Sequence, residues 1–484
     1  MNRPAVAHSR RIIFIVLAVS LVSSACISAR RAPNLEHIFA AARARSGKRP
    51  VIVIPGILGS ELINAKTGET VWPSAFRTSQ EGLPISPDLA ANRDDLIPGK
   101  IIETVKLARV LPEVYVYRDL LLALRQYGGY RDGDWNNPSV DGHQDTFYVF
   151  SYDWRQDNVS NARELIRRIA QLKARLQRPD LKFNIVAHSM GGLIARYAAM
   201  YGDADLPAGD GPIQPTWLGA AHIGKIVMIG VPNEGSADAF ATLVEGYSIT
   251  EGLRRRVPLL NKLTAEDVVR TPSVFQLLPH RAAVKFLDEN LKPLAVDLYD
   301  REVWKRYGWS VIYSSPEFRR RYAAMAGTDG SDGRSEDELD VYLAAILRRA
   351  RRFHEALDAV GAPNSPVVLL AIGGDCEETL SSPVILRDEK RNRWLTLTRP
   401  REYRTSGGVK ISKQKITEAM YAPGDGRVTR TSLLGENLFK LRDSQTGFTL
   451  SRYAVFGCDL HGQLPRNKTL QDNALTAIVS EVMN

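Results

Sequence analysis

The residues best suited to chemistry lie in the segment AHSMG, residues 187–191. The apolar, β-branched run 183–187 predicts a buried strand, and the apolar face of the sequence after it predicts a helix. Ser189 therefore lies at a sharp strand-to-helix turn, which pushes a serine hydroxyl clear of a sheet. A helix that starts at Met190 points its N–H groups and its positive dipole end at an oxyanion formed on that hydroxyl. The pattern predicts a nucleophilic serine.

A serine nucleophile needs an imidazole as its general base. Four histidines follow Ser189, and among them only His461 lies just past the last predicted strand, 453–457. When the nucleophile comes first in the chain, the base is expected at that late position. We therefore predict His461 as the base. His188 adjoins the serine but points elsewhere through the turn, so we predict a structural role for it.

Two aspartates could orient the imidazole. Asp375 directly follows the predicted strand 367–372, where a plain serine hydrolase keeps its acid, and Asp425 lies fifty residues later. The Gly-Asp-Gly context of Asp425 provides a tight turn that can hold a carboxylate rigidly against an imidazole. These residues alone leave both positions open.

Six short, continuous apolar runs alternate with helical patterns along the chain. Such runs are typical of a parallel sheet covered on both faces. Together with the serine turn, they predict an α/β class protein, a doubly wound α/β-hydrolase core with a helix-rich cap. The predicted units are a signal peptide (1–26), a tether (27–49), a first core part (50–236), a cap insertion (237–365) and a second core part (366–484) with a hairpin excursion (377–420).

The N-terminus has the features of an export signal. Three arginines precede the apolar run 12–22, which ends in the small residues SSAC. We predict a secretory signal peptide and export across a bacterial inner membrane. The product is either periplasmic or a membrane-anchored lipoprotein lipidated at Cys26; ordinary cleavage after Ala25 stays open.

The chain is basic. Its 484 residues carry a net charge of +10, which falls to +7 without the three leader arginines. Such a surface favours anionic partners, including phospholipid headgroups. We recognise no basic stripe with interleaved aromatics and no known binding motif, so the sequence predicts no nucleic-acid partner.

Five features together resemble one family. They are PVIVIPGILGSEL, FSYDWRQD, AHSMGGLIARY, PGDGRVT and the late His461. In order and spacing they are similar to the lecithin:cholesterol acyltransferase family, which includes lysosomal phospholipases and phospholipid:diacylglycerol acyltransferases. The resemblance spans residue 50 to about residue 465. It implies that Asp425 is the acid and that the backbone N–H groups of Ile57 and Met190 form the oxyanion hole.

The sequence departs from the family pattern in two places. Arg427 stands where the family usually has Thr, next to the expected acid. No cysteine lies between Cys26 and Cys376, so the disulfide-pinned membrane loop of the vertebrate members is absent. The early excursion around Trp72 is therefore expected to dock less rigidly on a membrane.

The predicted activity is a serine-dependent lipid acyl-ester hydrolase or O-acyltransferase that works through an acyl-enzyme. It needs no cofactor and no metal. We expect a lipid or acyl-ester substrate, contact with a membrane surface and a monomer. The alternatives are a carboxylesterase on non-membrane esters and a catalytically inactive binding protein of the cell envelope.

Two further expectations concern cysteines and tryptophans. Cys376 and Cys458 follow two strands expected to be parallel neighbours, at a spacing that a disulfide can bridge. In the cap, Trp304 and Trp309 are expected either to be exposed near the mouth of the site, where lipid enters, or to lie in the cap core.

Overall fold

The computed structural model describes residues 32–73, 82–86, 88–89, 93–106, 113–139, 144–248, 262–280, 283–325, 334–359, 365–439 and 450–479. The predicted signal peptide and Cys26 lie outside these residues. Within them, no helix is both long and apolar enough to cross a bilayer.

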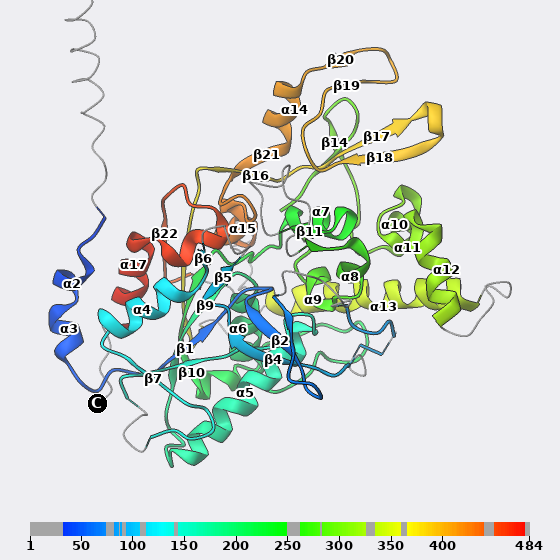
Figure 1. The fold of residues 1–484 in the computed structure, drawn as a ribbon. Coiled ribbons are helices and arrows are strands. Elements are labelled where there is room, and N and C mark those ends of the chain that lie inside the picture. Colours follow the sequence, from blue (N-terminus) through cyan, green and yellow to red (C-terminus); the bar gives the residue numbers. More distant parts are fainter. Residues whose placement is uncertain are drawn as a thin grey trace, which may run out of the picture.

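A seven-stranded sheet runs through the centre of the molecule (Figure 1). Every neighbouring pair of its strands is parallel. The strands, in spatial order, are β22 (Arg452–Val455), β15 (Val368–Gly373), β10 (Ile223–Ile229), β9 (Phe183–His188), β1 (Val51–Ile54), β8 (Thr146–Val149) and β7 (Arg131–Asp132).

Both faces of the sheet are covered, because side chains alternate along each strand. On β1, Val51 and Val53 join a core cluster with helices α4 (Arg118–Gln126) and α17 (Lys468–Val479). Ile52 and Ile54 of the same strand join the larger cluster with α5 (Asn158–Arg175) and α6 (Met190–Tyr201). This is the doubly wound parallel sheet that the apolar runs predict.

The segment before β1 differs from the prediction. Residues 27–49 are expected as a tether, but their described part forms helices α2 (Leu35–Ile38) and α3 (Ala40–Ala44). Leu35 and Phe39, four residues apart, share a face and are buried against the cluster of α4 and α17. Residues 32–49 therefore pack on the core.

Most of the described residues between β10 and β15 are helical. The helices are α7 (Ala237–Glu245), α8 (Ala265–Val269), α9 (Pro272–Phe275), α10 (Arg301–Tyr307), α11 (Val311–Ser314), α12 (Pro316–Met325) and α13 (Arg334–Leu357). The end of α13 contacts α6, where Arg196 donates to the Leu357 carbonyl and Tyr201 to that of Ala356. The boundaries of a separate cap domain stay a prediction.

Trp304 and Trp309 lie in the core of this helical region. Both are fully buried, and both pack edge-on against Phe240. Their indole N–H groups donate to Leu298 O at 2.7 Å and Thr396 Oγ1 at 2.8 Å. The expectation that they are exposed near the mouth is therefore wrong, because each has both an apolar environment and a hydrogen-bond partner inside the fold.

The FSYDWRQD motif ties this region to the sheet. Asp157 caps α5 by accepting from Ser160 N–H, and it pairs with Arg349 of α13 at 3.0 Å. The fully buried Arg155 pairs with Asp153 at 2.8 Å and with Asp94 at 2.6 Å. A buried guanidinium needs such partners, since an unpaired buried charge is costly.

The early excursion forms an antiparallel sheet of β2 (Ser60–Asn64), β3 (Thr70–Trp72) and β4 (Leu96–Ile101), followed by the pair β5 (Thr104–Lys106) and β6 (Glu113–Tyr115). Trp72 is buried, donates to Leu58 O at 3.1 Å and packs edge-on against Trp154. It is part of the core, so it does not serve as a membrane anchor.

The second excursion, residues 377–424, is called the hairpin module below. It consists of β16 (Glu377–Leu380), β17 (Val384–Asp388), β18 (Arg393–Leu397), β19 (Tyr403–Arg404), β20 (Lys410–Ile411), α14 (Lys413–Met420) and β21 (Tyr421–Gly424). The first and last strands pair antiparallel and form a stalk. The rest projects from the main body at the top right of Figure 1.

Candidate active site

The serine turn has the backbone that the sequence pattern predicts. Ser189 lies between β9 and α6 with φ of 53° and ψ of −128°, a strained conformation for a residue with a side chain. Its N–H donates to Ile229 O at 2.8 Å, which ties the turn to β10. At Gly191 a Cβ would lie 2.5 Å from Pro55 O, and at Gly192 one would lie 2.2 Å from the Val231 side chain. Only glycine fits there.

The structure brings Ser189, His461 and Asp425 together. His461 Nε2 lies 2.8 Å from Ser189 Oγ, and His461 Nδ1 lies 2.8 Å from Asp425 Oδ2. A carboxylate only accepts hydrogen bonds, so Nδ1 carries the proton and Nε2 is free to accept from the serine hydroxyl. All three side chains are nearly inaccessible to solvent. This arrangement can remove a proton from Ser189 as it attacks a carbonyl.

Asp425 is held by the backbone around it. Its Oδ1 accepts from Arg427 N–H at 3.1 Å and from Val428 N–H at 2.8 Å, and its own carbonyl accepts from His461 N–H. The Arg427 side chain pairs with Asp238 of α7, so the departure from the family's Thr leaves Asp425 in contact with His461. Asp375 is half-buried, and no described contact joins it to His461.

Gly230 is a residue of the site that the sequence analysis missed. It follows β10 with φ of +56°, and a Cβ there would lie 3.2 Å from both Asp425 Oδ2 and His461 Cε1. The same Cβ would lie 2.8 Å from the Leu464 side chain, so a side chain at this position would crowd Asp425 and His461. The pattern Ile-Gly-Val at the end of a predicted strand was the available signal.

The two predicted oxyanion-hole residues flank Ser189. Met190 is the first residue of α6, and Ile57 follows Gly56 in the loop after β1. That loop approaches so closely that a Cβ on Gly56 would lie 2.8 Å from Ser189 Cβ. The role of the Ile57 and Met190 N–H groups stays a prediction.

A buried network joins the loop after β1 to the backbone of His461. Tyr117 Oη accepts from Gly56 N–H at 2.8 Å and lies 2.7 Å from His188 Nδ1. His188 Nε2 lies 3.1 Å from the His461 carbonyl, to which it donates. The Tyr117 hydroxyl therefore donates its single proton to His188 Nδ1. Burial, reinforced by the nearby His461, holds the pKa of His188 well below its usual value, so the ring stays neutral.

Tyr117→Phe should lower both stability and catalysis. The change leaves Gly56 N–H and His188 Nδ1 without their shared buried partner, which should cost about 1–3 kcal/mol of unfolding free energy. Loosening of the loop that precedes Ile57 should lower kcat by roughly ten- to a hundredfold. Denaturant unfolding and steady-state kinetics measure the two effects.

The matched control is Tyr201→Phe. Tyr201 also donates a buried hydrogen bond, to Ala356 O at 2.7 Å, but it lies in α6 away from the acid–base pair. It should lose comparable stability and keep kcat. Equal kcat in the two variants would contradict a positioning role for Tyr117.

A disulfide joins Cys376 and Cys458, whose Cα atoms are 5.1 Å apart. Cys376 follows β15, and Cys458 follows β22, the parallel neighbour of β15. The bond thus connects the base of the stalk that leads to Asp425 with the segment that leads to His461. Both cysteines are exposed, so the bond is accessible to reductants.

Replacing both cysteines with alanine should destabilise the protein. The bond closes a loop of 82 residues, worth about 4 kcal/mol in the chain-entropy account. Denaturant unfolding of the double variant should show that loss, and wild type in reductant should show the same. Two free thiols in the purified, unreduced protein, with no change in stability on substitution, would contradict the bond.

Part of the chain is similar in sequence to a known protein family. Residues 142–329 match the family described as lecithin:cholesterol acyltransferase. The predicted resemblance to that family is confirmed. No curated protein matches the chain in sequence. The matched segment includes Ser189 and most of the helical insertion, and ends before Asp425 and His461.

Solved structures resemble the chain over most of its length. The Tle4–Tli4 complex matches with 15% identity and a TM-score of 0.51, over 90% of this chain and 98% of its own. The mature lipase BlEst2 of Bacillus licheniformis (11% identity, TM-score 0.32) covers 90% and 93%, and EstA from Clostridium botulinum (13%, 0.33) covers 91% and 89%. The similarity to the Tle4–Tli4 complex shows a shared fold only.

The chain has the α/β-hydrolase fold, as the sequence predicts: a parallel sheet with helices on both faces and a serine on the turn after a central strand. The family match and this fold together support, in general terms, a hydrolase or acyltransferase of lipid esters.

Proposed function

We propose that the protein is a serine-dependent hydrolase or O-acyltransferase of lipid acyl esters. The observation that carries the proposal is the continuous hydrogen-bonded chain Ser189–His461–Asp425 on the strained turn between β9 and α6. Such a chain activates a serine hydroxyl for nucleophilic attack, as in acyl transfer. The family match over the serine segment supports lipid esters as the substrate class.

In the first half-reaction, Ser189 Oγ attacks the acyl carbonyl while its proton moves to His461 Nε2. The oxyanion receives hydrogen bonds from the N–H groups of Ile57 and Met190. Asp425 stabilises the imidazolium. His461 then gives the proton to the departing alcohol, which leaves an acyl-enzyme on Ser189.

In the second half-reaction, an acceptor hydroxyl attacks the acyl carbon and gives its proton to His461 Nε2. The bond between the acyl carbon and Ser189 Oγ then breaks, and His461 returns the proton to Ser189 Oγ. The acceptor is water in hydrolysis and a lipid alcohol in transfer. Tyr117 and His188 keep the His461 backbone fixed through both halves, since the neutral His188 bonds to the His461 carbonyl.

We further propose that this enzyme acts outside the bacterial inner membrane, as a monomer, either free in the periplasm or anchored through a lipidated Cys26. The leader-like residues 1–26 support export. The disulfide supports an oxidising compartment.

Incubation with mixed phospholipids and a sterol, followed by mass spectrometry of the products, tests the proposal. Free fatty acid indicates hydrolysis, and a sterol or glyceride ester indicates transfer. Cleavage of soluble esters without any phospholipid turnover would instead assign a carboxylesterase on non-membrane esters. No turnover of any ester would favour an inactive binding protein of the cell envelope.

A further inference from the structure

The positive charge of the chain is concentrated in one stretch. Residues 387–415 contain ten Lys and Arg against three Asp and Glu, a net charge of +7. The three arginines of residues 1–26 account for the other +3 of the chain's +10. The residues outside these two segments therefore sum to zero, and residues 387–415 of the hairpin module carry a charge equal to the net charge of the body. The module as a whole has a net charge of +4, because Glu377, Glu378 and Glu418 lie near its ends. The net charge of the whole chain does not reveal this stretch, because it sums all residues together.

The cations of the module face solvent. Nine of the ten are exposed: Lys390, Arg391, Arg393, Arg399, Arg401, Arg404, Lys410, Lys413 and Lys415. Lys390, Arg401, Lys413 and Lys415 form no ion pair with any carboxylate of the described residues. The other arginine-rich segment, on α13, differs, because Arg348, Arg349, Arg351 and Arg352 each pair with a carboxylate. The module therefore brings several exposed cations without a carboxylate partner together in one short stretch.

Apolar side chains are exposed among these cations. Trp394, at the start of β18, is 37% exposed, and Val409, in the β19–β20 turn, is 59% exposed. The Arg387 guanidinium lies 5.0 Å from the centre of the Trp394 ring. Tryptophan among Lys and Arg is typical of a bilayer interface, where the ring lies at the level of the headgroups.

A shared buried cluster holds the parts of the hairpin module together. Leu386, Leu397, Ile411 and Ile416 from its two hairpins and α14 belong to one buried cluster. Leu287 of β13 (Phe286–Leu287), which pairs with β14 (Pro293–Leu294), joins that cluster from the helical insertion.

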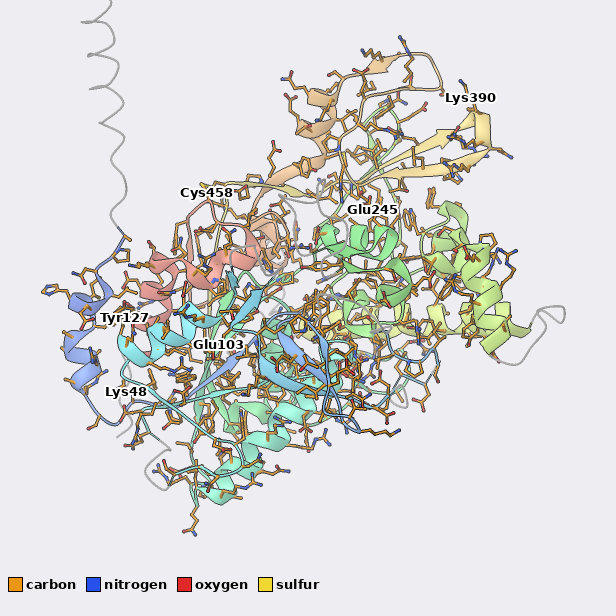
Figure 2. All side chains as sticks on the ribbon, in the orientation of Figure 1. Lys48, Glu103, Tyr127, Glu245, Lys390 and Cys458 are labelled. Atoms are coloured by element: carbon orange, nitrogen blue, oxygen red, sulfur yellow. A yellow bond between two sulfur atoms is a disulfide. The ribbon has the colours of Figure 1, made fainter. Side chains whose placement is uncertain are left out.

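The stalk places the module at the same end of the sheet as the site. β16 starts four residues after β15 ends, and β21 leads directly to Asp425. Figure 2 shows Lys390 at the outer end of the β17–β18 hairpin, far from Cys458 near the sheet. A flat anionic surface bound to the outer end of the hairpin module therefore faces the carboxyl ends of the central strands. Ser189 lies at that same end of the sheet.

We propose that the hairpin module docks the protein on an anionic phospholipid bilayer. Lys390, Lys413 and Lys415 contact lipid phosphates, and Trp394 enters the headgroup region. The proposal rests on the proposed function in one respect, since that function requires Ser189 to receive its substrate from a bilayer.

Vesicle sedimentation of the Ser189→Ala protein tests the docking without lipid turnover. Binding is expected to vesicles of phosphatidylcholine mixed with phosphatidylglycerol, to fall with added salt and to be weak on phosphatidylcholine alone. The variant Lys390→Gln/Lys413→Gln/Lys415→Gln should bind on the order of a hundredfold more weakly, at about a factor of five for each charge removed.

A matched control removes the same charge elsewhere. Lys100, Arg175 and Arg320 are exposed cations outside the module that form no ion pair with a carboxylate of the described residues, and their triple change to Gln should leave binding intact. Equal losses in the two triple variants, or equal binding to neutral vesicles, would overturn the proposal. Binding to duplex DNA with no binding to mixed vesicles would also overturn it and assign a nucleic-acid partner.

Trp394 provides a second readout, because it is the single tryptophan of the module. Brominated lipids in the mixed vesicles should quench tryptophan fluorescence on binding, and Trp394→Phe should remove most of that quenching while binding is kept. Quenching that is unchanged in Trp394→Phe would place another surface on the lipid. Since all these measurements use inactive protein, a wild type that binds vesicles but hydrolyses no lipid would count against the proposed function and not against the docking.

Discussion

Ser189→Ala should lower the turnover of acyl esters by on the order of 10⁶-fold, as loss of the nucleophile does in other serine hydrolases. The side chain supplies the attacking oxygen, and its described contact is with His461 Nε2. The fold should survive, because the core does not depend on that hydroxyl and the turn is held by backbone contacts of β9, α6 and β10. Steady-state kinetics and thermal unfolding measure both expectations.

Ser273→Ala is the matched control. Ser273 is also a fully buried serine with a hydrogen bond, to the Trp154 carbonyl, but it belongs to α9. It should lose some stability and keep its activity. Full activity in Ser189→Ala would contradict the nucleophile assignment.

Asp425→Asn should lower the rate by about 10⁴-fold. An amide can turn its NH₂ toward His461 Nδ1, which then no longer carries a proton, and Nε2 becomes protonated and cannot accept from Ser189. The backbone contacts of Arg427 and Val428 to Oδ1 favour that orientation, because the remaining amide oxygen accepts both.

Asp375→Asn is the comparison that separates the two aspartates left open by the residues alone. Asp375 follows β15 in the same region but has no described contact with His461. Its substitution should change kcat little. A larger loss in Asp375→Asn than in Asp425→Asn would move the acid to Asp375.

The serine turn and the base could be predicted from sequence because their signals are local. Ser189 needs a strand, a turn and a helix within about twenty residues, and His461 needs only its place after the last strand. The choice of Asp425 needed the family resemblance. Its carboxylate reaches His461 only after a module of nearly fifty residues has folded and its two end strands, β16 and β21, have paired.

Features built from distant residues could not be predicted in the same way. Tyr117 meets His188 across 71 positions of sequence, and neither residue carries a pattern that marks the other. Tryptophan is a common residue at membrane-facing surfaces, but Trp304 and Trp309 are buried by tertiary packing against Phe240. Residues 32–49 carry several basic side chains, but Leu35 and Phe39 lie on one face and pack into the cluster of α4 and α17.

Mapping of a fluorophosphonate adduct tests the central claim most directly. Such a reagent phosphorylates an activated serine and leaves a stable mass on one peptide. The account predicts a single adduct on Ser189 in the wild-type protein, and none in a His461→Ala variant under the same conditions, because the hydroxyl is then no longer activated. An unmodified wild-type protein, or an adduct on any other serine, would contradict it.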